Sequence, residues 1–235
     1  MVGEIPRGLD HLRMLAQLSN QTRRSSDPEL EKHPQDLRVI GLALSALYEA
    51  ATCHRHCHGG PHILESLIGR SYNLGCAAYI LISRGFYDEA LSLIRSVGEI
   101  SNLISLSVVD KDALRRWLTA DRQTRLQDFS PAKVRRLLAT KAEPMMYADT
   151  DWYSSLCEKY THVNPGTKPN LHNAEGLPHV GGVLQPAGLT NSLSELATVL
   201  GFVAMPVCKY FRFDDLFDEL RRAVGPSASD EEPAS

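Results

Sequence analysis

ILESLIGRSYNLGCAAYILISRGFYDEALSLIRSVGEISNLISLSVV, residues 63–109, decides the fold of this chain. The stretch indicates two helices, at 63–84 and 87–109, because Gly85 ends the first one and leaves only a short turn before the second. Helices joined so closely pack antiparallel as neighbours in a bundle. Both contain many small residues, although each glycine costs a helix roughly 1 kcal/mol relative to alanine. Helices that keep such residues pack closely on both sides, so this pair is expected at the centre of the bundle.

Further helices are indicated on both sides of the central pair. The sequence predicts an all-α fold, an antiparallel helical bundle of four to five long helices with short peripheral helices. It divides the chain into an N-terminal helix and linker (1–34), the bundle (35–224) and a disordered acidic tail (225–235). The additional helices are expected at 9–18, 34–57, 112–125, 131–140, 150–162, 191–210 and 211–224, with a long loop near 163–190.

The composition is that of an ordinary globular protein. Of the 235 residues 43% are hydrophobic and 23% are charged, so the chain can bury a core without a disulfide or a metal. A net charge of −3 gives no global reason to expect binding to nucleic acid or a membrane. The most apolar run, 71–83, has thirteen residues, fewer than the roughly 20 that span a membrane. Five irregularly spaced cysteines without a secretory leader predict a cytoplasmic protein with reduced thiols.

Arg95 and Glu99 are the first candidate site residues. Four residues apart on the helix at 87–109, they face the same way, and they are its only charges between Glu89 and Asp110. The pair is either a surface ion pair or the lining of an internal polar cavity, in which a buried arginine would need a carboxylate partner.

Tyr160 and His162 are the second candidates. They lie where a predicted helix must stop, because Pro165 and Gly166 cannot continue it. A histidine at a helix end often does no more than cap carbonyl groups. Beside a tyrosine hydroxyl it could instead transfer a proton, with Arg95 stabilising phosphate charge.

CHRHCHGGPH, residues 53–62, is the third candidate and would bind zinc. On a continuing helix, Cys53 and Cys57 lie one turn apart, and so do His54 and His58. The two pairs point about 100° apart, so a single ion cannot use all four from a regular helix. Either pair could hold two positions on the ion, and His62 or His172 would have to be recruited to complete the site. The candidate ligands are Cys53, Cys57, His58 and His62. Histidines near a helix end are also favoured by its dipole alone.

Residues 111–141 form a candidate basic patch that could hold phosphates through arginine. The alternative is a solvated helical face, or one neutralised by the acidic residues near 214–219. The phosphate-binding and hydrolase signatures GxGxxG, GxxxxGK[ST], GxSxG and HExxH are absent from the sequence. Nucleotide-dependent enzymes of the common folds are thereby disfavoured.

LIRSVGE at 93–99 followed by YTHVNP at 160–165 resembles a family of prokaryotic helical-bundle proteins that is loosely similar to the HEPN superfamily. The resemblance covers about 34–210. It implies a homodimer from a stress or defence context that binds RNA or a nucleotide-like ligand. In the catalytic version, a metal-independent ribonuclease, His162 is the acid or base, Arg95 stabilises the phosphorane, Glu99 orients Arg95 and Tyr160 binds the substrate. The alternatives are a scaffold with a cognate protein partner and a zinc-binding protein.

Overall fold

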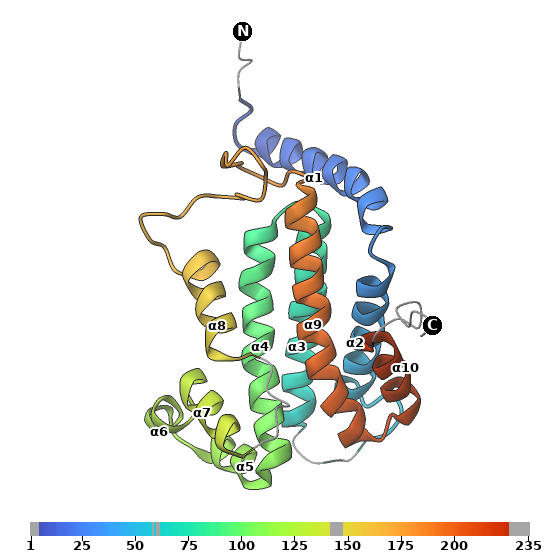
Figure 1. The fold of residues 1–235 in the computed structure, drawn as a ribbon, viewed down its shortest axis with the longest axis vertical. Helices are drawn as coiled ribbons and strands as arrows, with labels where there is room; N and C mark the ends of the chain where they lie inside the picture. The colour runs from blue at the N-terminus through green and yellow to red at the C-terminus, as the bar shows by residue number, and fades with distance from the viewer. Residues whose placement is uncertain (1–4, 58, 60–61, 142–147, 226–235) are drawn as a thin grey trace, which may run out of the picture.

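The computed structural model describes residues 5–57, 59, 62–141 and 148–225. In this part of the chain ten α-helices and one π-helical turn, without a strand, form an all-α helical bundle (Figure 1). The predicted fold class is confirmed, and the predicted tail at 226–235 lies outside the described residues. The elements are α1 (Leu9–Leu30), α2 (Pro34–Ala51), α3 (Ile63–Ser83), α4 (Tyr87–Val109), α5 (Lys111–Thr119), α6 (Arg122–Asp128), α7 (Pro131–Lys141), α8 (Thr150–Leu156), the π-helix η1 (Cys157–Thr161), α9 (Pro186–Phe211) and α10 (Asp214–Val224).

Helices α2, α3, α4 and α9 enclose the main core. Each contributes fully buried aliphatic side chains, among them Leu47, Ile68, Ile94 and Leu196. The small residues let these helices approach closely, as expected for α3 and α4. A Cβ atom on Gly75 of α3, for example, would lie 2.9 Å from a methyl group of Leu200 on α9. α3 and α4 therefore lie side by side within the bundle, while shorter helices cover its lower end (Figure 1).

Helix α9 runs in the same direction as α2 and α4, which corrects the prediction of a purely antiparallel bundle (Figure 1). Its first turn contacts the first turn of α4, where a Cβ on Gly188 would lie 2.5 Å from the Tyr87 ring. Its last turn lines a small cavity together with Ile104 of α4. The long connection 162–185 carries the chain back to the starting end, the kind of crossover that some four-helix bundles contain.

Several predicted helix boundaries were wrong. Helix α1 continues to Leu30 instead of ending at 18, because Pro28 falls in its last turn and the neighbouring Ser26 and Leu30 are buried. Helix α2 ends at Ala51, since Cys53 adopts a left-handed conformation with φ 52°. The expected helix 112–125 is divided at Ala120, which is extended.

Helices α4 and α9 are each long and apolar enough to cross a membrane by length and composition, as core helices of soluble proteins also are. In the bundle, 44% of the most apolar window of α4 and 67% of that of α9 are buried. Their apolar sides therefore form the protein core, which is consistent with a soluble protein.

Candidate functional site

One face of α4 carries a polar seam, formed by Asp88, Ser92, Arg95 and Glu99. Their spacing of four, three and four residues places them in a line along the helix. Helix α8, η1 and the following loop pack along this line beside α4 (Figure 1). Asp88 contacts His172, Ser92 contacts Thr161 at 3.3 Å between hydroxyl oxygens, and Arg95 and Glu99 contact Tyr153. The two segments that the sequence singled out therefore do meet.

Arg95, Glu99 and Tyr153 form a closed triangle of hydrogen bonds. Arg95 Nη1 donates to Glu99 Oε1 at 2.9 Å and to the Tyr153 hydroxyl at 2.7 Å, and that hydroxyl donates to Glu99 Oε1 at 2.7 Å. Only 16% of the Arg95 side chain is exposed. Burial lowers the pKa of Arg95, but the charges of Glu99, Tyr153 and Cys157 outweigh it and raise the pKa overall. The pair is therefore a largely buried ion pair and not a surface one.

Arg135 on α7 lies on the same tyrosine. Its guanidinium carbon is 4.1 Å from the centroid of the Tyr153 ring, and the Arg95 carbon is 5.2 Å from it. Arg135 is buried, and its Nε and Nη1 have no hydrogen-bond partner in the described part of the chain. The predicted basic patch falls on α5–α7, where Arg115 and Arg116 are paired with acidic neighbours. Among the described residues, Arg135 is thus an arginine of that patch whose positive charge is buried without a carboxylate partner.

Tyr160 and His162 occupy different surroundings. Tyr160 is half-buried in η1 and stacks on His172, with ring centroids 6.0 Å apart and planes at 17°. His162 follows the π-helix with an extended backbone, is exposed, and donates its backbone N–H to Cys157 at 2.8 Å. The hydrogen bonds of Arg95 go to Glu99, Tyr153 and Cys157, so His162 is not among its contacts. The catalytic roles of His162 and Tyr160 stay predictions.

His172 is the buried histidine of this region. Its Nε2 lies 2.7 Å from Asp88 Oδ1, and 9% of its side chain is exposed. Asn170 holds the same loop: its backbone N–H donates to Asp88 Oδ2, and its amide donates to the carbonyls of Gly85 and Gly181. These bonds fix the loop across the first turn of α4.

Cys53, Cys57 and His62 form a second cluster, between α2 and α3. Their donor atoms all lie within 4.8 Å of one another, so the group could hold a metal ion. Cys53 Sγ is 3.7 Å from His62 Nδ1, and Cys57 Sγ is 3.9 Å from His62 Nε2. His58, the fourth expected ligand, lies outside the described residues. The cluster forms in a non-helical connection, so the helical spacing invoked for Cys53 and Cys57 was wrong.

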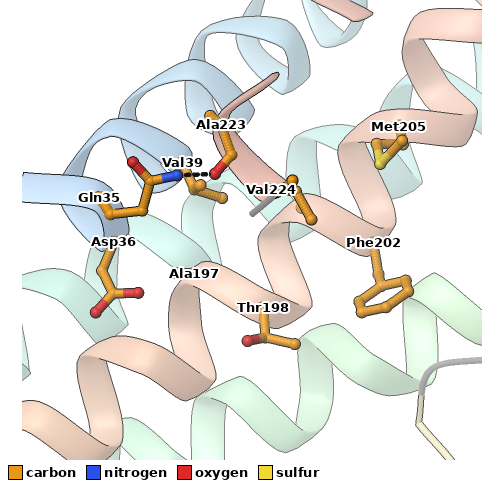
Figure 2. Close-up of a pocket in the computed structure, with 11 residues that line it drawn as sticks. Gln35, Asp36, Val39, Ala197, Thr198, Phe202, Met205, Ala223 and Val224 are labelled. Atoms are coloured by element: carbon orange, nitrogen blue, oxygen red, sulfur yellow. Dashed lines mark hydrogen bonds between the residues drawn. The ribbon is translucent and has the colours of Figure 1, made fainter. Parts of the chain in front are cut away.

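A third feature is an apolar cleft where α10 meets α2 and α9 (Figure 2). Gln35 donates a side-chain hydrogen bond to the Ala223 carbonyl across it. Asp36 lies at its edge, where burial raises its pKa and His33 partly opposes the shift. The cleft has a volume of about 220 Å³. Because small-molecule sites usually occupy about 300–1,000 Å³, this cleft is too small to favour a ligand.

The structure adds Asp88 and Tyr153, which sequence reasoning missed. Arg135 was expected only in the basic patch, and His172 only as a possible zinc ligand. The sequence could have indicated Asp88, because it continues the line of Arg95 and Glu99 along one face of a helix. Tyr153 lies on a separate short helix, and His172 lies in a loop without periodicity. Their contacts depend on the tertiary fold.

The comparisons with known proteins give no relative. No family model matches the chain, and neither a curated protein nor a solved structure matches it. Function is therefore inferred from the geometry of the chain.

Proposed function

We propose that this is a zinc-binding helical-bundle protein in which the ion joins α2 to α3 through Cys53, Cys57 and His62. The observation that carries the proposal is the convergence of three donor atoms within 4.8 Å. Thiolate and imidazole are preferred ligands of zinc, and two of them on a tetrahedral ion lie about 3.6 Å apart. The distance of 3.9 Å between Cys57 Sγ and His62 Nε2 is close to that value.

The backbone at this cluster supports the proposal. Cys53 and His62 are both left-handed, with φ of 52° and 47°. For residues other than glycine such conformations cost on the order of 1 kcal/mol or more, and they concentrate at functional sites. Here they turn two donor side chains toward each other from the end of α2 and the start of α3. Metal binding would offset this cost.

Glu65 lies near enough to His62 to become the hydrogen-bonding outer partner that a metal-binding histidine usually has. Its Oε1 lies 3.6 Å from His62 Nδ1, and 10% of its side chain is exposed. A carboxylate at one ring nitrogen fixes the tautomer and leaves the other nitrogen for the metal. We assign Nε2, the nitrogen that faces Cys57, as the zinc ligand.

Arg55 holds the connection in place before any ion binds. It lies between the two cysteines, donates to Asp215 Oδ1 at 2.6 Å and also bonds Glu49. Its guanidinium carbon is 4.9 Å from the Phe213 ring centroid. The cluster is thereby anchored to α2 and to the start of α10, which reduces the ordering that metal binding must supply.

The test is the metal content of purified protein, measured by elemental mass spectrometry. We expect one zinc per chain in the wild type and loss of it in Cys57→Ser. Cys76→Ser is the matched control, because Cys76 is a partly buried cysteine on α3 outside the cluster. Wild-type protein without zinc, or equal zinc in all three proteins, would contradict the proposal. Thiolate ligands must stay reduced, so we also place the protein in the cytoplasm.

RNA binding by a HEPN-like homodimer is the second candidate function. The observation that favours it is the buried Arg135. Two of its guanidinium nitrogens have no hydrogen-bond partner among the described residues, and the group packs on the Tyr153 ring, as that of Arg95 does. Arginine donors suit phosphate oxygens, so the basic face of α7 is where we would expect a strand to bind. In the test, labelled RNA is incubated in EDTA with wild type, Arg95→Ala and His162→Ala. Circular dichroism checks that each protein is folded, and light scattering measures the mass that a homodimer predicts. Cleavage lost in both variants supports a ribonuclease, and equal cleavage in all three indicates contamination.

A further inference from the structure

A second cleft lies at the opposite end of α3 from the cysteine cluster, about 30 Å away by the length of that helix. Its walls are the first turn of α4, the π-helix η1 and the loop at 164–172. Its volume is about 420 Å³, within the range of small-molecule sites and large enough for a mononucleotide. The zinc proposal does not involve this cleft. The lining residues that carry charge or a titratable ring are Asp88, Glu158, Lys159, Lys168 and His172.

Hydrogen bonds hold His172, one wall of the cleft, in a fixed orientation. Asp88 holds His172 through Nε2, and Gln185 Oε1 accepts the backbone N–H of His172 at 2.8 Å. The other ring nitrogen, Nδ1, has no hydrogen-bond partner among the described residues. A histidine that is fixed at one nitrogen and unpaired at the other can form a directional hydrogen bond with a ligand.

The wall beside it is aromatic and has an unusual backbone. Tyr160 stacks on His172, and it belongs to a five-residue π-helix that also supplies Glu158 and Lys159 to the cleft. π-Helical turns are rare and occur frequently at functional sites. The turn places a lysine, an aromatic ring and a carboxylate around one opening.

The charges that remain available favour an anion. Both oxygens of Asp88 are already occupied, one by His172 and the other by the Asn170 backbone. Lys159 and Lys168 have no ion-pair partner in the described part of the chain, and of the two lining carboxylates, Asp88 and Glu158, Asp88 is already hydrogen-bonded at both oxygens. The two ammonium groups are suitable donors for phosphate oxygens, and His172 Nδ1 is placed to accept a hydrogen bond from a ligand hydroxyl group.

We propose that this cleft binds a small phosphate-bearing ligand of nucleotide size. Lys159 and Lys168 contact the phosphate, and His172 Nδ1 accepts a hydrogen bond from a hydroxyl group of the ligand, which orients it. Glu158 limits how much negative charge the site accepts. Tyr160 forms the flat wall against which a base can lie.

The test is calorimetric titration of the full chain at low ionic strength with adenosine monophosphate, inorganic phosphate and adenosine. We expect adenosine monophosphate to bind more tightly than either of the other two. Lys159→Gln combined with Lys168→Gln should weaken its binding by about tenfold or more, and Glu158→Gln should strengthen it. Lys32→Gln combined with Lys209→Gln is the control, because it removes the same charge from exposed positions outside the cleft.

Each outcome decides the proposal. Weakened binding in the cleft pair together with unchanged binding in the control pair supports it. The proposal is overturned if adenosine monophosphate does not bind, if adenosine binds equally well, or if phosphate alone binds equally well. It is also overturned if the two double variants behave alike. All the lysines substituted are exposed, so loss of folding should not obscure the result.

Discussion

Tyr153→Phe should destabilise the protein by about 2 kcal/mol. The substitution keeps the ring, and with it the stacking of Arg95 and Arg135, and removes only the hydroxyl. That hydroxyl makes two hydrogen bonds of 2.7 Å, one with Arg95 and one with Glu99. A hydrogen bond to a charged group contributes about 1.5–3 kcal/mol. We use the lower part of that range, because 31% of the Glu99 side chain is exposed and the direct Arg95–Glu99 bond survives.

Urea unfolding followed by circular dichroism measures this cost. A double-mutant cycle of Tyr153→Phe with Glu99→Gln should give a coupling energy of about 1 kcal/mol, since the two groups share a hydrogen bond. Tyr79→Phe is the matched control, because Tyr79 is a partly buried tyrosine of the same bundle whose hydroxyl makes none of the hydrogen bonds described here. Its substitution should cost less than about 0.5 kcal/mol. A Tyr153→Phe cost as small as that of the control, or an absence of coupling, would refute the reasoning.

The raised pKa of Tyr153 predicts that the folding stability depends on pH. Burial, followed by hydrogen bonds with Glu99 and Cys157, raises the pKa of Tyr153 above its ordinary value of about 10. The unfolded chain therefore loses the phenolic proton at lower pH than the folded chain does. The stability linked to the neutral hydroxyl is fully present below about pH 10 and decreases as the pH rises toward the folded-state pKa. Over that interval the stability of wild type should fall more steeply than that of Tyr153→Phe.

Three further substitutions or reactions test other parts of the structure. Gly98→Ala should lower the free energy of unfolding in urea by about 1–2 kcal/mol, although alanine has the better helix propensity, because the added Cβ would lie 2.7 Å from the Trp152 ring. Equal or higher stability of the variant would contradict this packing. Asn170→Ala should lower the free energy of unfolding by about 3 kcal/mol, because the carbonyls of Gly85 and Gly181 lose their donor and alanine must adopt a φ of 47°. Amide exchange should increase across the loop at 162–185. Under native conditions a thiol reagent should label Cys57 after chelation but not Cys208, which is buried and whose pKa burial raises to about 12; mass spectrometry of labelled peptides identifies the site.

The sequence predicted the central helices well because their signals are local. The bounds expected for 87–109 coincide with α4, and α3 ends one residue before its expected end. The glycine between them and the short connection leave little freedom in where the first helix ends and the second begins. Asp110 follows α4 directly, and its side chain accepts from the backbone N–H groups of Asp112 and Ala113, so it caps α5.

The failures occurred where tertiary packing decides the backbone. The first helix was expected to end at 18, but α1 continues through Pro28, because one missing N–H in a last turn is tolerated when that turn packs on the bundle. The expected helix 150–162 changes to a π-helix at Cys157, a change that no local propensity encodes. Helix α9 begins at Pro186, five residues before its expected start, because proline suits the first turn of a helix.

The candidate site was predictable to the extent that its residues share a helix. Arg95 and Glu99 were expected to pair because they are four apart, and they do. Cys53, Cys57 and His62 could be grouped because they are close in sequence, although the conformation that unites them is not helical. His172 could not be assigned to Asp88, since 84 residues and two changes of direction separate them.

The direction of α9 explains why a cleft exists at the starting end of α4. If α9 ran antiparallel to α4, a short turn at the far end would join the two, and nothing would cross the first turn of α4. Because α9 runs parallel to it, the chain must return over the full length of the bundle before α9 begins (Figure 1). That return places Asn170 and His172 on Asp88, which binds the loop at two points from the first turn of α4. A consequence can be measured: Asp88→Asn should loosen amide protection in the loop at 164–172 while leaving the core helices protected. Equal protection of that loop in the variant and the wild type would mean that the crossover holds its position without Asp88.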